Sequence, residues 1–277
     1  MTLRRIDISN ARAVITGAAG GLGDASARVL RARGVKVIGI DCKEVGKDIL
    51  CCDVTDMRTT IGAVAEAAGL LGGIDILINC AGIGLAHDAA TELREDLRRI
   101  VEVNLFGTWN VTSAAVPYLL RGHGHVINIS SGIAVLAMPY GAAYCASKRA
   151  VSAYSDVLRL EYRNRLTVTT MYPGFLRTHI HDRNVAQGYS IEGVVPADTL
   201  DGAARAMVRA CEQRPREAYT SRTTEVSLRL ARVFPRLFEW GLQRRLEACM
   251  RNSPPPAFLR HQSNIGSGDR FDGSARD

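Results

Sequence analysis

The sequence predicts an α/β protein with a doubly wound parallel sheet, formed as a single domain with a helical C-terminal extension. Apolar, strand-like runs alternate with helical stretches from the start of the chain. A glycine-rich turn follows the first strand and opens the first helix, and polar residues stand where later strands end. Open α/β sheets bind ligands at these carboxyl ends, so the same observations predict a ligand site.

The first part of the chain is expected to form four strands and two helices. The strands are Arg12–Thr16, Val35–Ile40, Ile49–Cys52 and Ile74–Ile78. The helices are Gly21–Arg33, with Gly34 as its C-terminal stop, and Asp56–Leu71. The segment Asp41–Asp48 is too short for a crossover helix, so we expect a loop there.

The alternation continues to residue 220. We expect helices at Thr91–Arg121, Ala142–Arg163 and Pro196–Glu212, and strands at His125–Ile129, Leu166–Met171 and Glu217–Thr220. Phe175–Val195 is predicted to be a flexible loop over a substrate. Continuous apolar strands between helices indicate a parallel sheet covered on both faces, which is the Rossmann fold.

Composition fits one large globular domain followed by an extension. The chain has 277 residues, 47% hydrophobic and 23% charged, with a formal net charge of +7. We divide it into a nucleotide-binding and catalytic domain at 1–220, a helical extension at 221–265 and a disordered tail at 266–277. The late arginines alternate with apolar residues at helical spacing, which favours a solvated helix face and argues against nucleic acid as a partner.

The sequence favours a cytoplasmic protein. No apolar run reaches the roughly 18 residues that a membrane span needs, and the N-terminus has no apolar signal region. The seven cysteines form no Cys-x-x-Cys pair, so we expect reduced thiols. His179 and His181 have no cysteine or carboxylate cluster beside them, so we expect no metal site.

The glycine-rich turn predicts a pyrophosphate site. It includes Gly17, Gly21, Leu22 and Gly23, directly between the first strand and the first helix. Glycines let the backbone approach a phosphate closely, and the free N–H groups at a helix N-terminus favour negative charge. A dinucleotide is therefore the expected ligand.

Asp41 at the end of the second strand favours NAD over NADP. A carboxylate there can accept hydrogen bonds from the adenosine ribose hydroxyls and repel an extra phosphate. Lys43 nearby weakens this preference, because a cation can accept a phosphate. Residues that follow two later strands complete the predicted cofactor site. They are Asp53 and Val54 after the third strand, and Asn79, Ala81 and Gly82 after the fourth.

Three residues predict acid/base chemistry. Ser131 ends the fifth strand, and Tyr144 and Lys148 share one face of the next helix. A tyrosine normally titrates near 10, so its anion needs about 4 kcal/mol of stabilisation to act near neutral pH. A lysine ammonium one turn away, together with an oxidised nicotinamide, can supply much of it. Ser131 can hold the substrate oxygen.

These motifs together make the chain resemble the classical short-chain dehydrogenase/reductase family. The resemblance covers roughly Ser9 to Thr220, and its motifs are Thr16-Gly17-x-x-x-Gly21-x-Gly23, Asp53, Asn79-x-Ala81-Gly82, Asn104, Ser131, Tyr144-x-x-x-Lys148 and Pro173-Gly174. It implies that Tyr144 is the acid/base, that Lys148 binds the nicotinamide ribose and lowers the tyrosine pKa, and that Ser131 orients the substrate.

The resemblance also implies further roles. Asn104 would hold a water that links Lys148 to solvent, and the residues Pro173, Gly174, Leu176 and Thr178 would meet the nicotinamide carboxamide. The family usually has Asn-Asn-Ala-Gly after the fourth strand, and Cys80 replaces the second Asn here. This replacement calls a local hydrogen bond into question, but not the cofactor site.

We therefore expect an NAD-dependent enzyme that moves a hydride between the cofactor and a largely apolar secondary alcohol or ketone. The expected pocket wall is apolar and consists of Ile133, Ala134, Val135, Leu136, Met138, Phe175 and Leu176. The alternatives are an NADPH-dependent ketoacyl reductase, which Asp41 disfavours, and a non-catalytic NAD-sensing protein, which has no need of the Asn104, Ser131, Tyr144 and Lys148 set. Relatives pair through the two long helices, so a homodimer or homotetramer is expected.

The C-terminal extension has an apolar stripe that allows two interpretations. The stripe consists of Val226, Leu230, Val233, Leu237 and Trp240, and Pro235 is expected to divide or start a helix. Arginines give the segment a basic side. Packing on the same subunit or a neighbour is favoured, and peripheral contact with an anionic membrane is the alternative.

Overall fold

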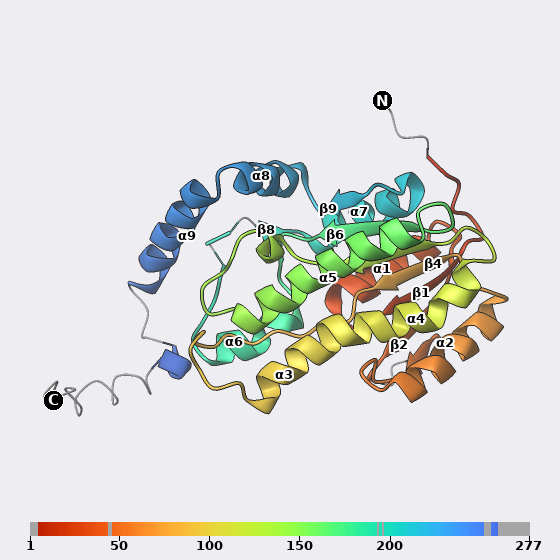
Figure 1. Ribbon diagram of the computed structural model, residues 1–277, viewed down its shortest axis with the longest axis horizontal. Helices are drawn as coiled ribbons and strands as arrows, with labels where there is room; N and C mark the ends of the chain where they lie inside the picture. Colours follow the sequence, from red (N-terminus) through yellow and green to blue (C-terminus); the bar gives the residue numbers. More distant parts are fainter. Residues whose placement is uncertain (1–4, 44–45, 193, 196, 252–255, 260–277) are drawn as a thin grey trace, which may run out of the picture.

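A seven-stranded parallel sheet forms the centre of the computed structural model, which describes residues 5–43, 46–192, 194–195, 197–251 and 256–259 (Figure 1). The strand order is β3-β2-β1-β4-β5-β6-β9. The strands are β1 (Arg12–Thr16), β2 (Lys36–Asp41), β3 (Ile49–Cys51), β4 (Ile76–Asn79), β5 (His125–Ile129), β6 (Thr167–Tyr172) and β9 (Glu217–Tyr219). Strand β1 pairs with both β2 and β4, so the order reverses there and the doubly wound prediction is confirmed.

Helices cover both faces of the sheet. Helices α1 (Gly21–Arg31) and α7 (Leu200–Gln213) pack on one face, and α2 (Met57–Leu71), α4 (Thr108–Leu119) and α5 (Ala142–Glu161) on the other. Successive side chains of a strand point to opposite faces. In β1, Ile15 therefore packs in the α1–α7 core while Val14 packs in the α2–α4–α5 core. This double burial explains the continuous apolar runs in the sequence.

The prediction of one continuous helix at Thr91–Arg121 is wrong. The structure has α3 (Glu95–Val101), then a π-helical turn (Glu102–Gly107), then α4. The widened turn holds Asn104, whose side-chain amide is bonded at both ends to the backbone of Ile83, at 2.8 and 3.0 Å. Thr108 also donates its hydroxyl to the Asn104 carbonyl at 2.8 Å. These side-chain contacts stabilise the widened turn, which apolar periodicity cannot reveal.

The helix expected at Pro196–Glu212 begins later. Pro196 lies outside the described residues, and α7 starts at Leu200 with Thr199 as its N-cap, accepting from the Gly202 N–H at 3.1 Å. Just before it, β8 (Ala197–Asp198) pairs with β7 (Phe175–Leu176). Two short helices, a 3₁₀ turn at His179–His181 and α6 (Asp182–Ala186), occupy the segment expected to be a loop.

The C-terminal extension forms α8 (Arg222–Val233), α9 (Pro235–Met250) and a 3₁₀ turn at Ala257–Leu259, and α9 begins at the proline that was expected to interrupt the stripe. The stripe does not pack on its own subunit, because Val226, Leu230, Val233, Leu237 and Trp240 are 45–67% exposed. The opposite sides of these helices do pack, through Leu228, Ala231, Leu242 and Leu246. The tail expected at 266–277 lies outside the described residues. Within the described chain, no helix is long and apolar enough to cross a membrane.

Candidate active site

The carboxyl ends of the strands open into a cleft of about 750 Å³. Fifteen of the sixteen residues predicted to bind the cofactor line it: Gly17, Gly21, Leu22, Gly23, Asp41, Asp53, Val54, Ala81, Gly82, Tyr144, Lys148, Pro173, Gly174, Leu176 and Thr178. The cleft runs across the point where the strand order reverses, which is where open α/β sheets bind nucleotides.

Two glycines of the turn after β1 have no room for a side chain. Gly17 has φ +67, and a Cβ there would lie 2.8 Å from the Ala81 Cα. A Cβ on Gly23 would lie 2.1 Å from the Gly17 carbonyl oxygen. The turn can therefore fold tightly against the start of α1, and Gly21, Leu22 and Gly23 of that start line the cleft. This cradle fits the pyrophosphate of a dinucleotide.

Asp41 is held at the end of β2 by backbone hydrogen bonds. One carboxylate oxygen accepts the Ala19 N–H at 3.0 Å, and the other accepts the Lys43 N–H at 3.1 Å. The carboxylate thus lies beside the glycine-rich turn, where the adenosine ribose of a dinucleotide would be. The negative charge disfavours a phosphate at this end of the cleft.

Asp53 has an ion-pair partner that the sequence did not indicate. Arg99 on α3 donates to the Asp53 carboxylate, and the Thr55 backbone N–H donates to it at 3.0 Å. Burial alone would raise the pKa of Asp53, but these hydrogen bonds outweigh it and lower the pKa. Arg99 also lines the cleft, and it does so through its position on α3.

Asn79 is the predicted cofactor residue that the cleft does not include. Its amide nitrogen donates to Thr112 at 2.9 Å and to Asn128 at 2.8 Å, so the buried side chain joins β4 to β5 and α4. At Cys80, where the family usually has Asn, the backbone N–H donates to the Thr16 hydroxyl at 3.0 Å. This bond joins β1 to the loop after β4 without using the Cys80 side chain.

Ser131, Tyr144 and Lys148 meet on one wall of the cleft. The Lys148 Nζ lies 5.8 Å from the Tyr144 ring centroid and donates to the Ile129 carbonyl at 2.9 Å. Burial raises the pKa of Tyr144 to about 12, and the Ser131 hydroxyl acts against this rise. Burial lowers the pKa of Lys148 to about 8. Burial therefore disfavours the charged form of both groups, while a lysine with a pKa of about 8 stays mostly protonated at neutral pH.

Asn104 is fully buried behind this wall. Besides its bonds to Ile83, its amide donates to the Ser147 hydroxyl at 2.9 Å. A Cβ on Gly82 would lie 3.2 Å from both the Asn104 Oδ1 and the Lys148 Nζ, so Gly82 separates the two side chains. The water between Asn104 and Lys148 that the family resemblance implies stays a prediction.

An adjoining pocket of about 370 Å³ meets the cleft at Tyr144. Three residues of the expected apolar wall line it: Ile133, Met138 and Phe175. Leu136 and Leu176 line the cleft instead. Ala134 and Val135 line neither, because they pack with Tyr172 and Leu228, so their assignment to the wall is wrong.

The loop histidines differ in their surroundings. His179 is exposed and its ring nitrogen lies 2.9 Å from Asp182, as expected for a solvent-facing residue. His181 lies 4.8 Å from the Phe175 ring and is partly buried, while both histidines line the pocket and the cleft. Arg177 donates to Glu192 at 3.0 Å at the rim of the pocket. Among the residues that the structure describes, no group of three or more His, Cys, Asp and Glu could hold a metal ion.

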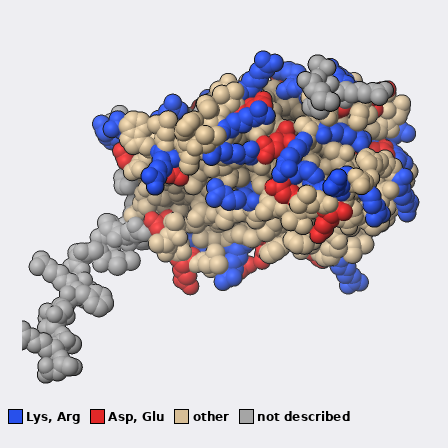
Figure 2. Space-filling model, turned by 45° about the horizontal axis from the view of Figure 1, so that its top comes forward, with Lys and Arg blue, Asp and Glu red and all other residues tan. Residues whose placement is uncertain are grey.

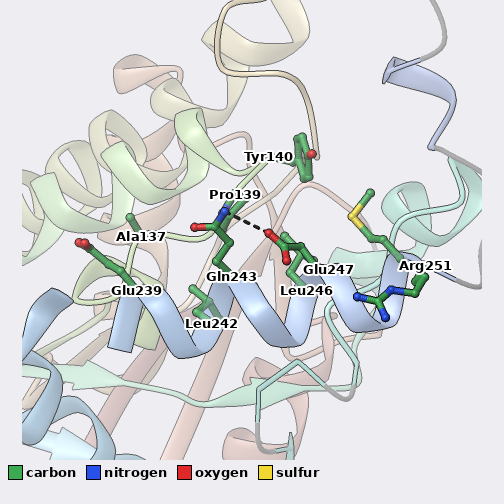
Figure 3. Close-up of a pocket in the computed structure, with 10 residues that line it drawn as sticks. Ala137, Pro139, Tyr140, Glu239, Leu242, Gln243, Leu246, Glu247 and Arg251 are labelled. Carbon is green, nitrogen blue, oxygen red and sulfur yellow. Dashed lines mark hydrogen bonds between the residues drawn. The ribbon is translucent and has the colours of Figure 1, made fainter. Parts of the chain in front are cut away.

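The C-terminal extension also contributes to the site. Thr224, Ser227 and Leu228 of α8 and Leu242 of α9 line the cleft. On the inner side of α9, a separate cavity of about 690 Å³ lies between this helix and the segment 137–140 (Figure 3). Pro139 and Tyr140 line both this cavity and the substrate-sized pocket. No motif or residue spacing in the sequence predicts that α9 and the segment 137–140 lie next to each other.

Comparison with known proteins identifies relatives of this chain. A model of the short chain dehydrogenase family matches residues 11–188. The chain is 36% identical over 222 residues to Dehydrogenase/reductase SDR family member 7B of Danio rerio, covering 72% of each chain. It is 35% identical over 181 residues to 3-ketodihydrosphingosine reductase of Bacteroides thetaiotaomicron, covering 63% of this chain and 67% of the relative.

Solved structures share the fold. A short chain dehydrogenase from Burkholderia cenocepacia in complex with NADP is 28% identical with a TM-score of 0.73, covering 86% of this chain and 99% of that chain. One from Mycobacterium paratuberculosis bound to NAD is 23% identical with a TM-score of 0.70, covering 77% and 97%. The second likeness concerns the fold alone.

Proposed function

The chain belongs to the short-chain dehydrogenase family, and we propose that it is an NAD-dependent oxidoreductase that interconverts a largely apolar secondary alcohol and its ketone. One observation carries this proposal: Tyr144 lines both the large cleft and the smaller pocket, with Ser131 and Lys148 beside it. A substrate oxygen in the pocket can reach the Tyr144 hydroxyl while its carbon faces the cleft.

The residues perform acid/base chemistry in this arrangement. During oxidation of an alcohol, Tyr144 accepts the hydroxyl proton, and during reduction of a ketone it returns the proton. The residues of the cleft would hold a nicotinamide cofactor, which would supply the hydride chemistry when bound. Ser131 donates to the substrate oxygen. The Lys148 ammonium favours the Tyr144 phenolate, and a positively charged nicotinamide would favour it further, so both act against the rise in pKa that burial causes.

Asp41 supports NAD as the cofactor. Its carboxylate accepts the Ala19 N–H and lines the cleft, so with the adenosine ribose bound there the extra phosphate of NADP would meet a like charge. The Burkholderia relative is bound to NADP, so an NADPH-dependent reductase is the second candidate. The exposed Lys43 beside Asp41 favours that alternative.

The pocket lining supports an apolar substrate. Ile133, Met138 and Phe175 surround the Tyr144 side, and Ile180, Val185 and Ile191 cover it from the loop. Each buried methylene contributes roughly 0.8 kcal/mol, so affinity should rise with the apolar size of the substrate. The Bacteroides relative is named as a reductase of a keto compound, which agrees with a ketone on the oxidised side of the reaction.

The proposal is tested by measuring the turnover of a homologous series of secondary alcohols through the absorbance of NADH. We expect kcat/KM to increase with chain length, and Tyr144→Phe to lower the rate by about 10²–10⁴ while NADH still binds. Efficient turnover of a polyol, with no gain from chain length, would refute the apolar substrate. A Phe variant with near-normal turnover, or NADH binding with no turnover of any alcohol or ketone, would refute the assigned chemistry.

A further inference from the structure

Helices α8 and α9 present two different faces. The inner face is closed by Leu228, Ala231, Leu242 and Leu246, which are all buried. The outer face carries six large apolar side chains that are 45–67% exposed: Val226, Leu230, Val233, Phe234, Leu237 and Trp240. The helices lie at the periphery of the molecule, with α8 beside β9 at the edge of the sheet (Figure 1). We call these six residues the outer stripe.

The spacing places the stripe on one side of each helix. Val226, Leu230 and Val233 follow one another at four and three residues in α8, and Leu237 and Trp240 are three apart in α9. Phe234 lies between the two helices. Soluble monomers rarely expose so many large apolar groups together, and a patch of this kind indicates a contact surface.

The charges beside the stripe are positive. Between Arg222 and Met250 the chain has six arginines and three glutamates, and all six arginines are exposed. Glu239 and Glu247 line the cavity on the inner side of α9 (Figure 3), and Glu225 is paired with Arg229 at 2.7 Å. Arg232 is also paired, with Glu217 of β9 at 2.8 Å, so in the described part of the chain two of the six arginines have a glutamate partner and the three arginines of α9 supply unpaired positive charge.

The three arginines of α9 illustrate this surface. Arg244 lies over the ring of Trp240, with its guanidinium carbon 4.3 Å from the ring centroid. Arg236 and Arg245 have no carboxylate within 4.0 Å among the residues that the structure describes. Lysines and arginines are spread over the face seen in Figure 2, with uncharged surface and some acidic residues between them.

We infer that the outer stripe and its arginines dock this protein on an anionic membrane surface. Amphipathic helices that lie in the plane of a bilayer combine apolar and aromatic side chains with arginines that meet lipid phosphates. Tryptophan with an arginine stacked on it suits the boundary between lipid tails and headgroups. The contact would be peripheral, because no described helix can cross a bilayer.

A second copy of the chain fits this face less well. In a two-fold dimer the same surface lies on both sides of the interface. The arginines would then face arginines with few carboxylates between them, which costs binding energy. An anionic lipid surface has the complementary charge.

Tryptophan fluorescence provides the first test. The chain has two tryptophans, so Trp109→Phe leaves Trp240 as the sole reporter. We expect its emission to shift to shorter wavelength with vesicles that contain phosphatidylglycerol, and to be quenched by brominated lipid. Emission that does not change with any vesicle would overturn the proposal.

Co-sedimentation with vesicles gives the second test. We expect the protein to pellet with phosphatidylcholine vesicles that contain phosphatidylglycerol, less at high salt, and little with phosphatidylcholine alone. Arg236→Gln/Arg245→Gln should weaken partitioning about 25-fold, since one arginine near an anionic surface contributes about fivefold. Leu237→Ser/Trp240→Ser should weaken it on both kinds of vesicle.

A matched control uses the opposite side of the molecule. Arg58→Gln/Leu70→Ser removes one exposed arginine and one exposed leucine from α2 and should leave sedimentation unchanged. All variants should keep wild-type turnover of a short, water-soluble alcohol, which shows that they fold and separates this proposal from the proposed function. Equal loss in the control would overturn the proposal. The proposal would also be overturned if the wild type did not bind vesicles and Leu237→Ser/Trp240→Ser dissociated an oligomer. That result would show that a second copy of the chain covers this face.

Discussion

Catalysis and burial have opposite effects on the charge of Lys148. Catalysis needs its ammonium beside Tyr144, while burial favours the neutral amine and lowers its pKa to about 8. Its hydrogen bond to the Ile129 carbonyl compensates only part of the lost hydration. The folded protein is therefore less stable with this charged lysine than it would be with an apolar side chain of similar size.

Lys148→Met should raise the free energy of unfolding of the cofactor-free protein at pH 7, by up to about 3 kcal/mol, while abolishing turnover. The folded pKa of Lys148 lies below the unfolded one. The wild type therefore gains stability as pH rises from about 8 to 10.5, and the advantage of the variant shrinks over this window.

Urea unfolding at several pH values up to 10 measures the effect, because above 10 the raised pKa of Tyr144 contributes in the opposite direction. Lys148→Arg, which keeps the charge, should not stabilise the protein. A Met variant that is less stable than the wild type at pH 7 would contradict the prediction.

Asp41→Ser should narrow the preference for NAD over NADP by about tenfold or more, since it removes a like charge from the end of the cleft. Steady-state kcat/KM for the two cofactors measures it. Asp48→Ser is the matched control: it removes another carboxylate from the same connection, one that does not line the cleft. Equal use of NAD and NADP by the wild type would show that Asp41 does not select the cofactor.

The residues of the site that could be predicted are those whose role is local. The turn with Gly17, and Tyr144 one helical turn from Lys148, are defined by neighbours in sequence. Arg99 could not be predicted, because its contact with Asp53 joins residues 46 positions apart. Asn79 stands at a strand end as expected, but the polar side chains of α4 and β5 turn it inward.

At the scale of elements, the strands were the most predictable part. Their residues are buried on both faces, so β1 and β5 have the boundaries that the apolar runs predict. The sequence predicted one continuous helix around Asn104, because the spacing of its apolar residues hardly changes there. The π-helical turn depends instead on hydrogen bonds to Ile83, which is distant in sequence. Likewise, the start of α7 depends on the cap at Thr199.

The start of α8 gives a prediction for an element. Ser221 caps this helix by accepting the Thr224 N–H at 3.1 Å. Ser221→Ala should lower the free energy of unfolding by about 1 kcal/mol. It should also raise KM for the cofactor, because Thr224, Ser227 and Leu228 of this helix line the cleft.

Thermal unfolding and steady-state kinetics of the same preparations measure both effects. Ser221→Asn is the control, since asparagine caps helices as well as serine does. If Ser221→Ala changes stability but leaves KM for the cofactor as in the wild type, α8 does not contribute to cofactor binding.

For the whole molecule, we predict a homodimer or homotetramer that forms through the long helices. Four large apolar side chains are more than half exposed: Phe106 on the π-helical turn, Trp109 on α4, and Val157 and Leu160 on α5. Packing them against a second copy would bury this apolar surface. Val157→Lys/Leu160→Lys should therefore dissociate the oligomer, as measured by light scattering, while the control Leu70→Lys should not. A strict monomer at micromolar concentration would contradict the prediction.

Helix α9 is a wall with a cavity on one side and the outer stripe on the other. If that stripe rests on lipid, the cavity and the adjoining pocket lie within a helix diameter of the bilayer. An apolar substrate then reaches the enzyme by diffusing in two dimensions. The velocity would follow the mole fraction of substrate in the vesicles instead of its bulk concentration. Adding empty lipid at constant total substrate would slow the reaction, a dependence known as surface dilution.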